Sequence, residues 1–140
     1  MRISIHLSEN LHFVAKTRHF DTIHIDEPES FHGTDLGPSS VEYILIGIGG
    51  CLGSTLSFCL KKKKIEIKDL EIIIGGTLKH EGPNKRLRIV RVNAEIFLAT
   101  ENSDSDEQVG FCINNFLEHC VVSNSIIPGF PIDVKVIQKK

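Results

Sequence analysis

Several common catalytic signatures are missing from this sequence. None of its four cysteines forms a CxxC pair, which argues against a thioredoxin-type redox motif and against the usual zinc-binding spacings. There is no G-x-S-x-G sequence, so a serine hydrolase with a nucleophile elbow is excluded. Gly75-Gly76 lacks the lysine and the hydroxyl residue that complete a phosphate-binding loop. These absences leave the cysteines themselves as the residues whose chemistry needs an explanation.

Neither an excess of one charge nor a long apolar run stands out. The chain has 16 Lys and Arg against 18 Asp and Glu, and no basic stretch with interleaved aromatic residues points to nucleic acid. The short basic run Lys61 to Lys64 is typical of a helix C-terminus. We count no apolar run of the ~18 residues that span a bilayer, and the N-terminus does not resemble a signal peptide. We therefore expect a cytoplasmic protein, without nucleic-acid or membrane partners, whose cysteines are mostly reduced.

The remaining composition is that of an ordinary globular protein, and 140 residues favour a single domain over residues 1–140. Alternation in period two predicts strands at about 1–7, 11–17, 20–26, 65–80, 86–100 and 132–136. Helical spacing predicts two helices, at about 39–62 and 104–119. The order βββ-α-ββ-α-β predicts an α+β fold, with the strands at 65–80 and 86–100 as a long hairpin.

The first predicted helix is apolar on nearly all sides. Ser39 with Glu42 forms a capping box at its start, and Asp104 with Glu107 does so for the second helix. A helix that is apolar all round is buried, so we expect this one to be the long central core helix. Its glycines are costly unless another backbone approaches closely. A domain of this size has little interior to cover such a helix, which favours a partner subunit.

Two of the cysteines sit in separate helical contexts. Cys51 lies within the first predicted helix, and Cys120 ends the apolar face of the second. Two single thiols on separate helices suggest that one thiolate attacks a peroxide and the other resolves the product as a disulfide. A plain core role is the alternative for each, since cysteine is among the most buried residues. We interpret Cys59 and Cys112 as core thiols, because eight residues of helix place each of them about 80° away from Cys51 or Cys120 and two turns along. The same spacing is not a zinc-binding pattern.

Two segments carry a family resemblance. Gly37 to Cys51 reads GPSSVEYILIGIGGC, and Cys120 to Ile126 reads CVVSNSI. Together, at this spacing, they resemble the OsmC/Ohr family of osmotically inducible and organic hydroperoxide resistance proteins, over nearly the whole chain. The resemblance implies an OsmC-like fold and an intertwined homodimer with two active sites across the interface. It also implies a thiol-dependent peroxidase that prefers organic hydroperoxides, with Cys51 as the reactive and Cys120 as the resolving cysteine. An external dithiol would recycle the disulfide, without metal, nucleotide or flavin.

The same resemblance suggests supporting residues. The chain also departs from the family pattern at two positions. Arg18, from the N-terminal hairpin, would hold the thiolate and polarise the peroxide, although an exposed turn arginine is the alternative. Glu42 would anchor that arginine, but nine residues of helix place it opposite Cys51, and Val41 stands where the peroxidase branch tends to have its acid. Val121 replaces a proline that usually follows the resolving cysteine.

A second hypothesis belongs to another class of protein. The chain could keep the fold as a non-catalytic small-ligand-binding protein, or as a purely structural dimeric module. The Cys51 thiol distinguishes these hypotheses, because an enzyme needs its reactive cysteine as a thiolate near neutral pH, whereas a buried structural thiol stays protonated.

Overall fold

The computed structural model describes residues 1–101 and 106–137 and confirms the α+β class. The chain forms two compact units, Met1–Gly47 and Ile48–Lys140. The helix that we predicted from residue 39 onward starts in the first unit and continues into the second. The predicted cap at Asp104 lies outside the described residues.

The first unit contains a three-stranded antiparallel sheet in the order β1-β2-β3. Its strands follow the predicted alternation closely: β1 Ser4–Glu9, β2 His12–Thr17 and β3 Phe20–Ile25. A short 3-10 helix, η1, covers Glu29–Phe31 in the predicted loop. Asp26 is buried at the end of β3, where its carboxylate accepts hydrogen bonds from the backbone of that loop, among them Thr34 N–H at 3.1 Å.

Helix α1 spans Ser40–Lys62 and begins with the predicted capping box. The Glu42 carboxylate accepts hydrogen bonds from Ser39 N–H and from the Ser39 hydroxyl, both at 2.7 Å. In return, Glu42 N–H donates to Ser39 Oγ at 3.3 Å. These bonds satisfy backbone donors that a helix start otherwise leaves free, so the cap is confirmed, and one carboxylate oxygen of Glu42 accepts both bonds.

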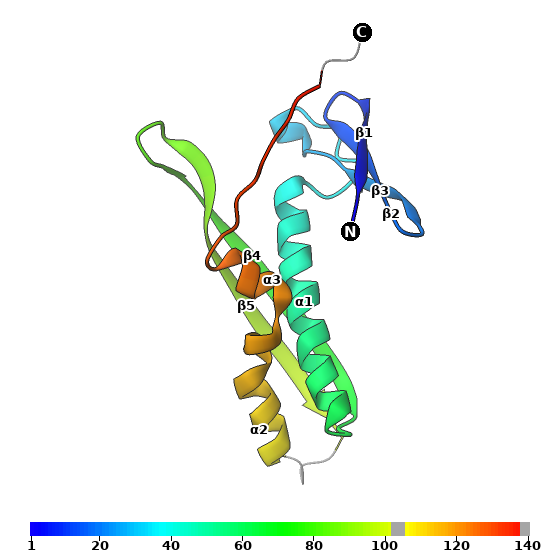
Figure 1. Ribbon diagram of the computed structural model, residues 1–140, viewed down its shortest axis with the longest axis vertical. Helices are drawn as coiled ribbons and strands as arrows, with labels where there is room; N and C mark the ends of the chain where they lie inside the picture. The colour runs from blue at the N-terminus through cyan, green and yellow to red at the C-terminus, as the bar shows by residue number, and fades with distance from the viewer. Residues whose placement is uncertain (102–105, 138–140) are drawn as a thin grey trace. The chain divides into compact units, whose positions relative to one another are not determined.

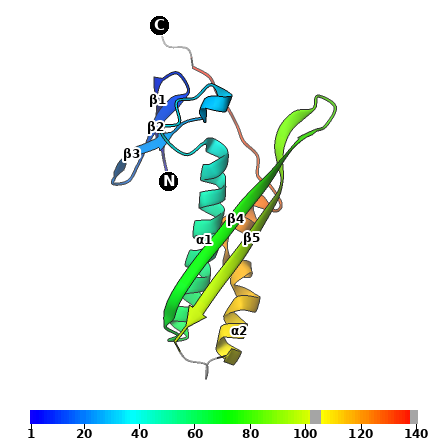
Figure 2. The same ribbon diagram turned by 180° about the vertical axis from the view of Figure 1, so that it is seen from behind.

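The second unit adds the predicted long hairpin to the rest of α1. Strands β4 (Ile67–Glu81) and β5 (Arg86–Thr100) pair antiparallel along their whole length. The turn between them places Gly82 at φ +78°, a left-handed conformation that glycine adopts without strain. Figures 1 and 2 show the hairpin on one side of α1, which it crosses obliquely.

The hairpin contains one β-bulge near its turn. Thr77 pairs with Arg91 and Leu78 pairs with Ile89, so Val90 has no partner on β4. The glycine pair of β4 keeps its register, because Gly75 pairs with Asn93 and Gly76 with Val92.

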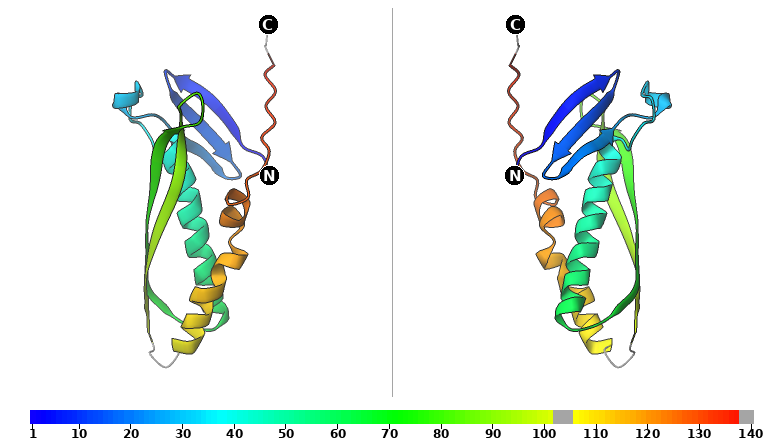
Figure 3. Two further views of the ribbon diagram at one scale, coloured as in Figure 1. Left: turned by 90° about the vertical axis from the view of Figure 1, so that its left-hand side faces the viewer. Right: turned by 90° about the vertical axis from the view of Figure 1, so that its right-hand side faces the viewer.

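The C-terminal helices cover the other side of α1. The second predicted helix is divided into α2 (Asp106–Asn115) and the 3-10 helix η3 (Phe116–His119), and α3 (Val121–Ile126) follows directly. Within the second unit, α1 thus lies between the β4–β5 hairpin and the α2–α3 segment (Figure 3). Helix α2 starts beside the C-terminal end of α1 and runs back along it, antiparallel (Figure 1).

One face of α1 forms the core of the second unit. Ile48, Leu52, Leu56 and Leu60 recur every four residues and are buried, and they pack against further buried residues: Ile65, Cys112, Phe116 and Cys120. The glycines let β4 come close to this face. A Cβ at Gly53 would lie 2.8 Å from the Ile72 side chain, and one at Gly49 would lie 3.6 Å from Ile74. The expected close approach is therefore made by side chains of β4.

Several apolar side chains of α1 are exposed in the part of the chain that the structure describes. Ile44, Ile46 and Phe58 are 45%, 54% and 69% exposed. With a mean hydropathy of 1.7 over its most apolar window, α1 has the length and composition of a membrane-spanning helix, which corrects our count of apolar residues. The core helix of a soluble protein meets the same criterion, so this feature alone decides nothing. The partner subunit stays a prediction.

The last predicted strand, around residues 132–136, does not form. Residues 127–137 belong to no helix or strand, and Ile132, Val134 and Val136 are 78–89% exposed. A strand needs a neighbour to satisfy its backbone groups. Among the described residues no strand pairs with this segment, so its alternating pattern predicted a strand for which the chain supplies no partner.

Candidate functional site

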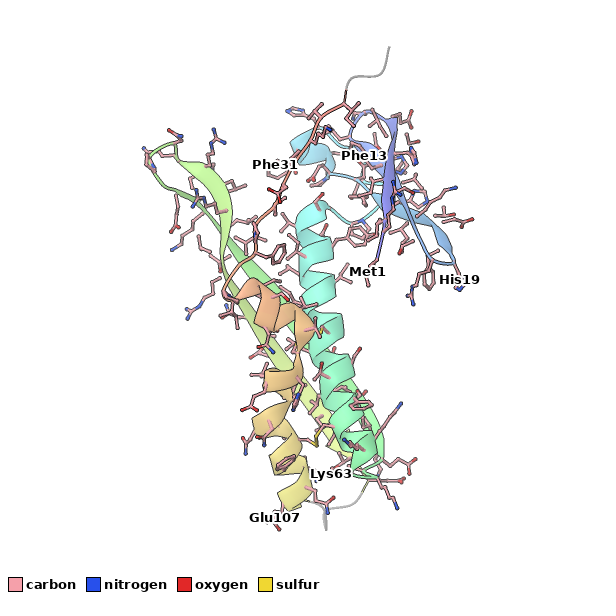
Figure 4. The ribbon with its side chains drawn as sticks, viewed as in Figure 1. Met1, Phe13, His19, Phe31, Lys63 and Glu107 are labelled. Carbon is pink, nitrogen blue, oxygen red and sulfur yellow. A yellow bond between two sulfur atoms is a disulfide. The ribbon has the colours of Figure 1, made fainter. Side chains whose placement is uncertain are left out.

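Four cysteines of the second unit lie between α1 and the α2–α3 segment and form two pairs. Cys59 on α1 and Cys112 on α2 form a disulfide, with their Cα atoms 5.7 Å apart. Figure 4 shows the sulfur–sulfur bond between the two helices. Our prediction that both are core thiols is therefore wrong about their chemistry. It is right about burial only for Cys112, which is fully buried, whereas Cys59 is half-buried.

The two remaining cysteines are free thiols. Cys51 is half-buried on α1, and Cys120 is fully buried where η3 meets α3. The Cys51 side chain lies close enough to Cys120 to help lower the pKa of the Cys120 thiol. The structure thus brings together the two cysteines that the sequence singled out.

Cys120 lies in a setting that stabilises a thiolate. Burial raises the pKa of this thiol, but hydrogen bonds from the side chain and backbone of Ser123, from the Cys51 thiol and from the Val122 backbone outweigh burial, so the pKa falls below its ordinary value. The Cys120 sulfur lies 3.2 Å from Ser123 Oγ. Hydrogen bonds to the charged form of a group favour that form.

The Ser123 hydroxyl should therefore control the ionisation of Cys120. We expect Ser123→Ala to raise the pKa of Cys120, because the thiolate loses its nearest hydroxyl donor. The measurement is the pH dependence of Cys120 alkylation by iodoacetamide, mapped by mass spectrometry. Ser125→Ala is the matched control, since its hydroxyl bonds to Val121 O instead. An unchanged titration midpoint in Ser123→Ala would contradict this account.

The position after Cys120 explains one departure from the family pattern. Cys120 is the N-cap of α3, and Val121 is the first residue of that helix. Proline is well tolerated at the first position of a helix, where the missing N–H has no intrahelical partner to lose. Valine at this position leaves α3 and the hydrogen bonds to Cys120 in place.

Arg18 and Glu42 both belong to the first unit. Arg18 lies in the turn between β2 and β3 at φ +50°, and its exposed guanidinium is 5.6 Å from the centre of the Phe20 ring. Glu42 is held in the capping box, where hydrogen bonds from the Ser39 backbone and hydroxyl lower the pKa of its carboxyl. A role for either residue at the thiols stays a prediction.

A groove next to the disulfide was not anticipated from the sequence. It has a volume of about 1030 Å³ and lies in the second unit, between α1 and the α2–η3 segment. Its lining combines three phenylalanines with several polar and charged residues and includes Cys59 but not Cys112: Ser54, Thr55, Phe58, Cys59, Lys62, Lys63, Phe111, Asn115, Phe116, Glu118 and His119. Within residues 1–101 and 106–137, no group of three or more His, Cys, Asp or Glu side chains could hold a metal.

A comparison with protein families gives one match. The family model described as "OsmC-like protein" matches residues 33–135, which include all four cysteines. The chain belongs to the OsmC-like family. The matched segment extends over parts of both compact units of this OsmC-like protein. A comparison with curated proteins gave no significant match.

Solved structures of other family members show the same fold. An OsmC-like protein from Mycoplasma pneumoniae aligns with a TM-score of 0.72 at 20% identity, covering 88% of this chain and 84% of that one. The organic hydroperoxide resistance protein OhrB of Bacillus subtilis aligns with a TM-score of 0.58 at 20% identity, covering 88% and 87%. An organic hydroperoxide resistance protein OsmC from Legionella pneumophila aligns with a TM-score of 0.64 at 17% identity, covering 88% and 85%.

Proposed function

We propose that this OsmC-like protein is a thiol-dependent peroxidase that reduces organic hydroperoxides through Cys51 and Cys120. The observation that carries the proposal is the proximity of these two free thiols, where Cys51 helps to lower the pKa of Cys120. The names of the Bacillus subtilis and Legionella pneumophila relatives, which refer to organic hydroperoxide resistance, support it.

The reaction has two steps. The Cys51 thiolate attacks one oxygen of the peroxide, the O–O bond breaks, and the products are a Cys51 sulfenic acid and, after protonation, an alcohol. The Cys120 thiolate then attacks the Cys51 sulfur, a disulfide forms, and the hydroxyl leaves with a proton as water. An external dithiol reduces this disulfide and becomes oxidised itself, so the cycle needs no bound cofactor.

The setting of Cys120 suits the second of these steps. A resolving cysteine attacks as a thiolate, so hydrogen bonds that lower its pKa increase the reactive fraction at neutral pH. Because Cys51 and Cys120 lie side by side, the sulfenic acid that forms on Cys51 is next to its resolving partner. Arg18 and Glu42 belong to the proposal only as assisting residues.

The protein is further proposed to be a cytoplasmic homodimer. The exposed apolar residues of α1 support a second subunit, because a monomer would leave them in water. Light scattering of the purified protein tests the subunit count, and a monomeric mass would contradict the dimer.

Mass spectrometry tests the peroxidase proposal. Reduced protein receives one equivalent of cumene hydroperoxide, and the remaining thiols are trapped with iodoacetamide after seconds. We expect a Cys51–Cys120 disulfide, and no such product in Cys51→Ser. Alkylation of both Cys51 and Cys120 at that time would overturn the proposal and favour a non-catalytic ligand-binding protein.

A further inference from the structure

The Cys59–Cys112 disulfide is not completely buried. Cys59 is half-buried and lines the groove between α1 and the α2–η3 segment, whereas Cys112 is fully buried and does not reach it. Cys59 is therefore the member of this bond that a reagent in the groove meets. Thiol attack on a disulfide depends on which sulfur is accessible, so an attacking thiol would reach Cys59 and the Cys112 sulfur would leave.

Positive charge gathers beside the accessible sulfur. Lys62 is the last residue of α1 and Lys63 follows it directly, three and four residues after Cys59, and both line the groove. The Lys63 ammonium lies 4.8 Å from the centre of the Phe111 ring, which is on the opposite wall of the groove. Figure 4 labels Lys63 at the end of α1. Glu118 is the one acidic residue of the lining, so the two ammonium groups outnumber it.

The rest of the lining is suited to a small organic molecule. Phe58, Phe111 and Phe116 give the groove apolar walls, while Asn115 and His119 add polar groups. A volume of about 1030 Å³ accommodates a molecule larger than a peroxide. A ligand with an apolar portion, a negative charge and a thiol would match each of these features.

We propose that the Cys59–Cys112 disulfide is a second redox site, which exchanges with low-molecular-weight thiols that carry a negative charge. A thiolate in the groove attacks the Cys59 sulfur, a mixed disulfide with Cys59 forms, and the Cys112 sulfur leaves and takes a proton. A second thiol attacks the sulfur of the bound thiol, which releases Cys59 as a thiol and yields the oxidised disulfide of the reagent. The protein gains two electrons, and two reagent thiols lose one each.

This site stands independently of the peroxidase proposal, because it uses the other pair of cysteines. The test compares three small thiols on the native protein at equal thiolate concentration: 2-mercaptoethanesulfonate (anionic), 2-mercaptoethanol (neutral) and cysteamine (cationic). Acid quenching, alkylation and peptide mapping follow Cys59 and Cys112 separately from Cys51 and Cys120. At low ionic strength we expect the anionic thiol to react about fivefold to tenfold faster than the cationic one, and the difference to shrink with salt.

Two variants sharpen the test. Lys62→Gln with Lys63→Gln should remove most of the charge preference, whereas Lys79→Gln, an exposed lysine on β4, should keep it. With limiting thiol, the mixed disulfide should be found on Cys59 and not on Cys112. Equal rates for the three thiols, a mixed disulfide on Cys112, or reduction only in denaturant would each overturn the proposal.

Discussion

Cys51→Ser should lower the rate of organic hydroperoxide reduction on the order of 10³-fold or more, because serine has no thiolate to attack the O–O bond. Cys120→Ser should behave differently. It should still consume about one equivalent of hydroperoxide and then stop, since the Cys51 sulfenic acid forms but finds no resolving thiol. Stopped-flow measurement of peroxide consumption, with and without a dithiol reductant, separates the first turnover from the steady state.

The contrast between these two variants assigns the roles. A sulfenic-acid probe such as dimedone should label Cys51 in Cys120→Ser and label nothing in Cys51→Ser. Ser57→Ala, which changes another polar side chain of α1, is the control for effects on the helix itself. If Cys51→Ser retained the single turnover and Cys120→Ser lost it, the roles would be reversed and the thiol with the lowered pKa would be the attacking one.

The sequence pattern predicted most of the helices and strands, and it succeeded where the residues of one segment determine the element. The capping box of Ser39 and Glu42 fixed the start of α1 to within a residue, because its hydrogen bonds involve only neighbours in the chain. The alternation around 132–136 failed for the opposite reason. A strand is defined by its partner, and nothing in the alternation of Ile132, Val134 and Val136 says whether a partner exists.

The disulfide was missed because each cysteine was compared only with the other cysteine of its own helix. Cys59 follows Cys51 by eight residues, and Cys112 precedes Cys120 by the same number. In two antiparallel helices, a step forward along one matches a step backward along the other. Once Cys51 faces Cys120, Cys59 therefore comes opposite Cys112. The sequence contained this signal, but reading it requires the antiparallel arrangement of α1 and α2.

The surroundings of the two free thiols were harder to foresee than the cysteines themselves. The lowered pKa of Cys120 depends on Ser123 and on backbone groups at the start of α3, which lies beyond the second predicted helix. The sequence around Arg18 predicts a hairpin turn, but it does not predict which groups the long side chain of Arg18 contacts. A residue in a turn is placed by tertiary structure, which its local pattern does not encode.

Removing the Cys59–Cys112 bond should destabilise the protein by about 4 kcal/mol, because the two cysteines are 53 residues apart and the crosslink restricts a long loop of the unfolded chain. Cys59→Ala with Cys112→Ala is the suitable variant, since serine would bury a hydroxyl at the fully buried position 112. Urea unfolding under non-reducing conditions measures the difference, and the midpoint of thermal unfolding should fall by roughly 10 °C.

Wild-type protein in a reductant separates the crosslink from the lost side-chain packing. It should lose most of the same stability, while the double variant should not respond to reductant. If the oxidised wild type and the double variant unfolded at the same urea concentration, the bond would contribute nothing to stability. The apolar core, which includes Leu56 and Phe116, would then hold α1 against the α2–η3 segment alone.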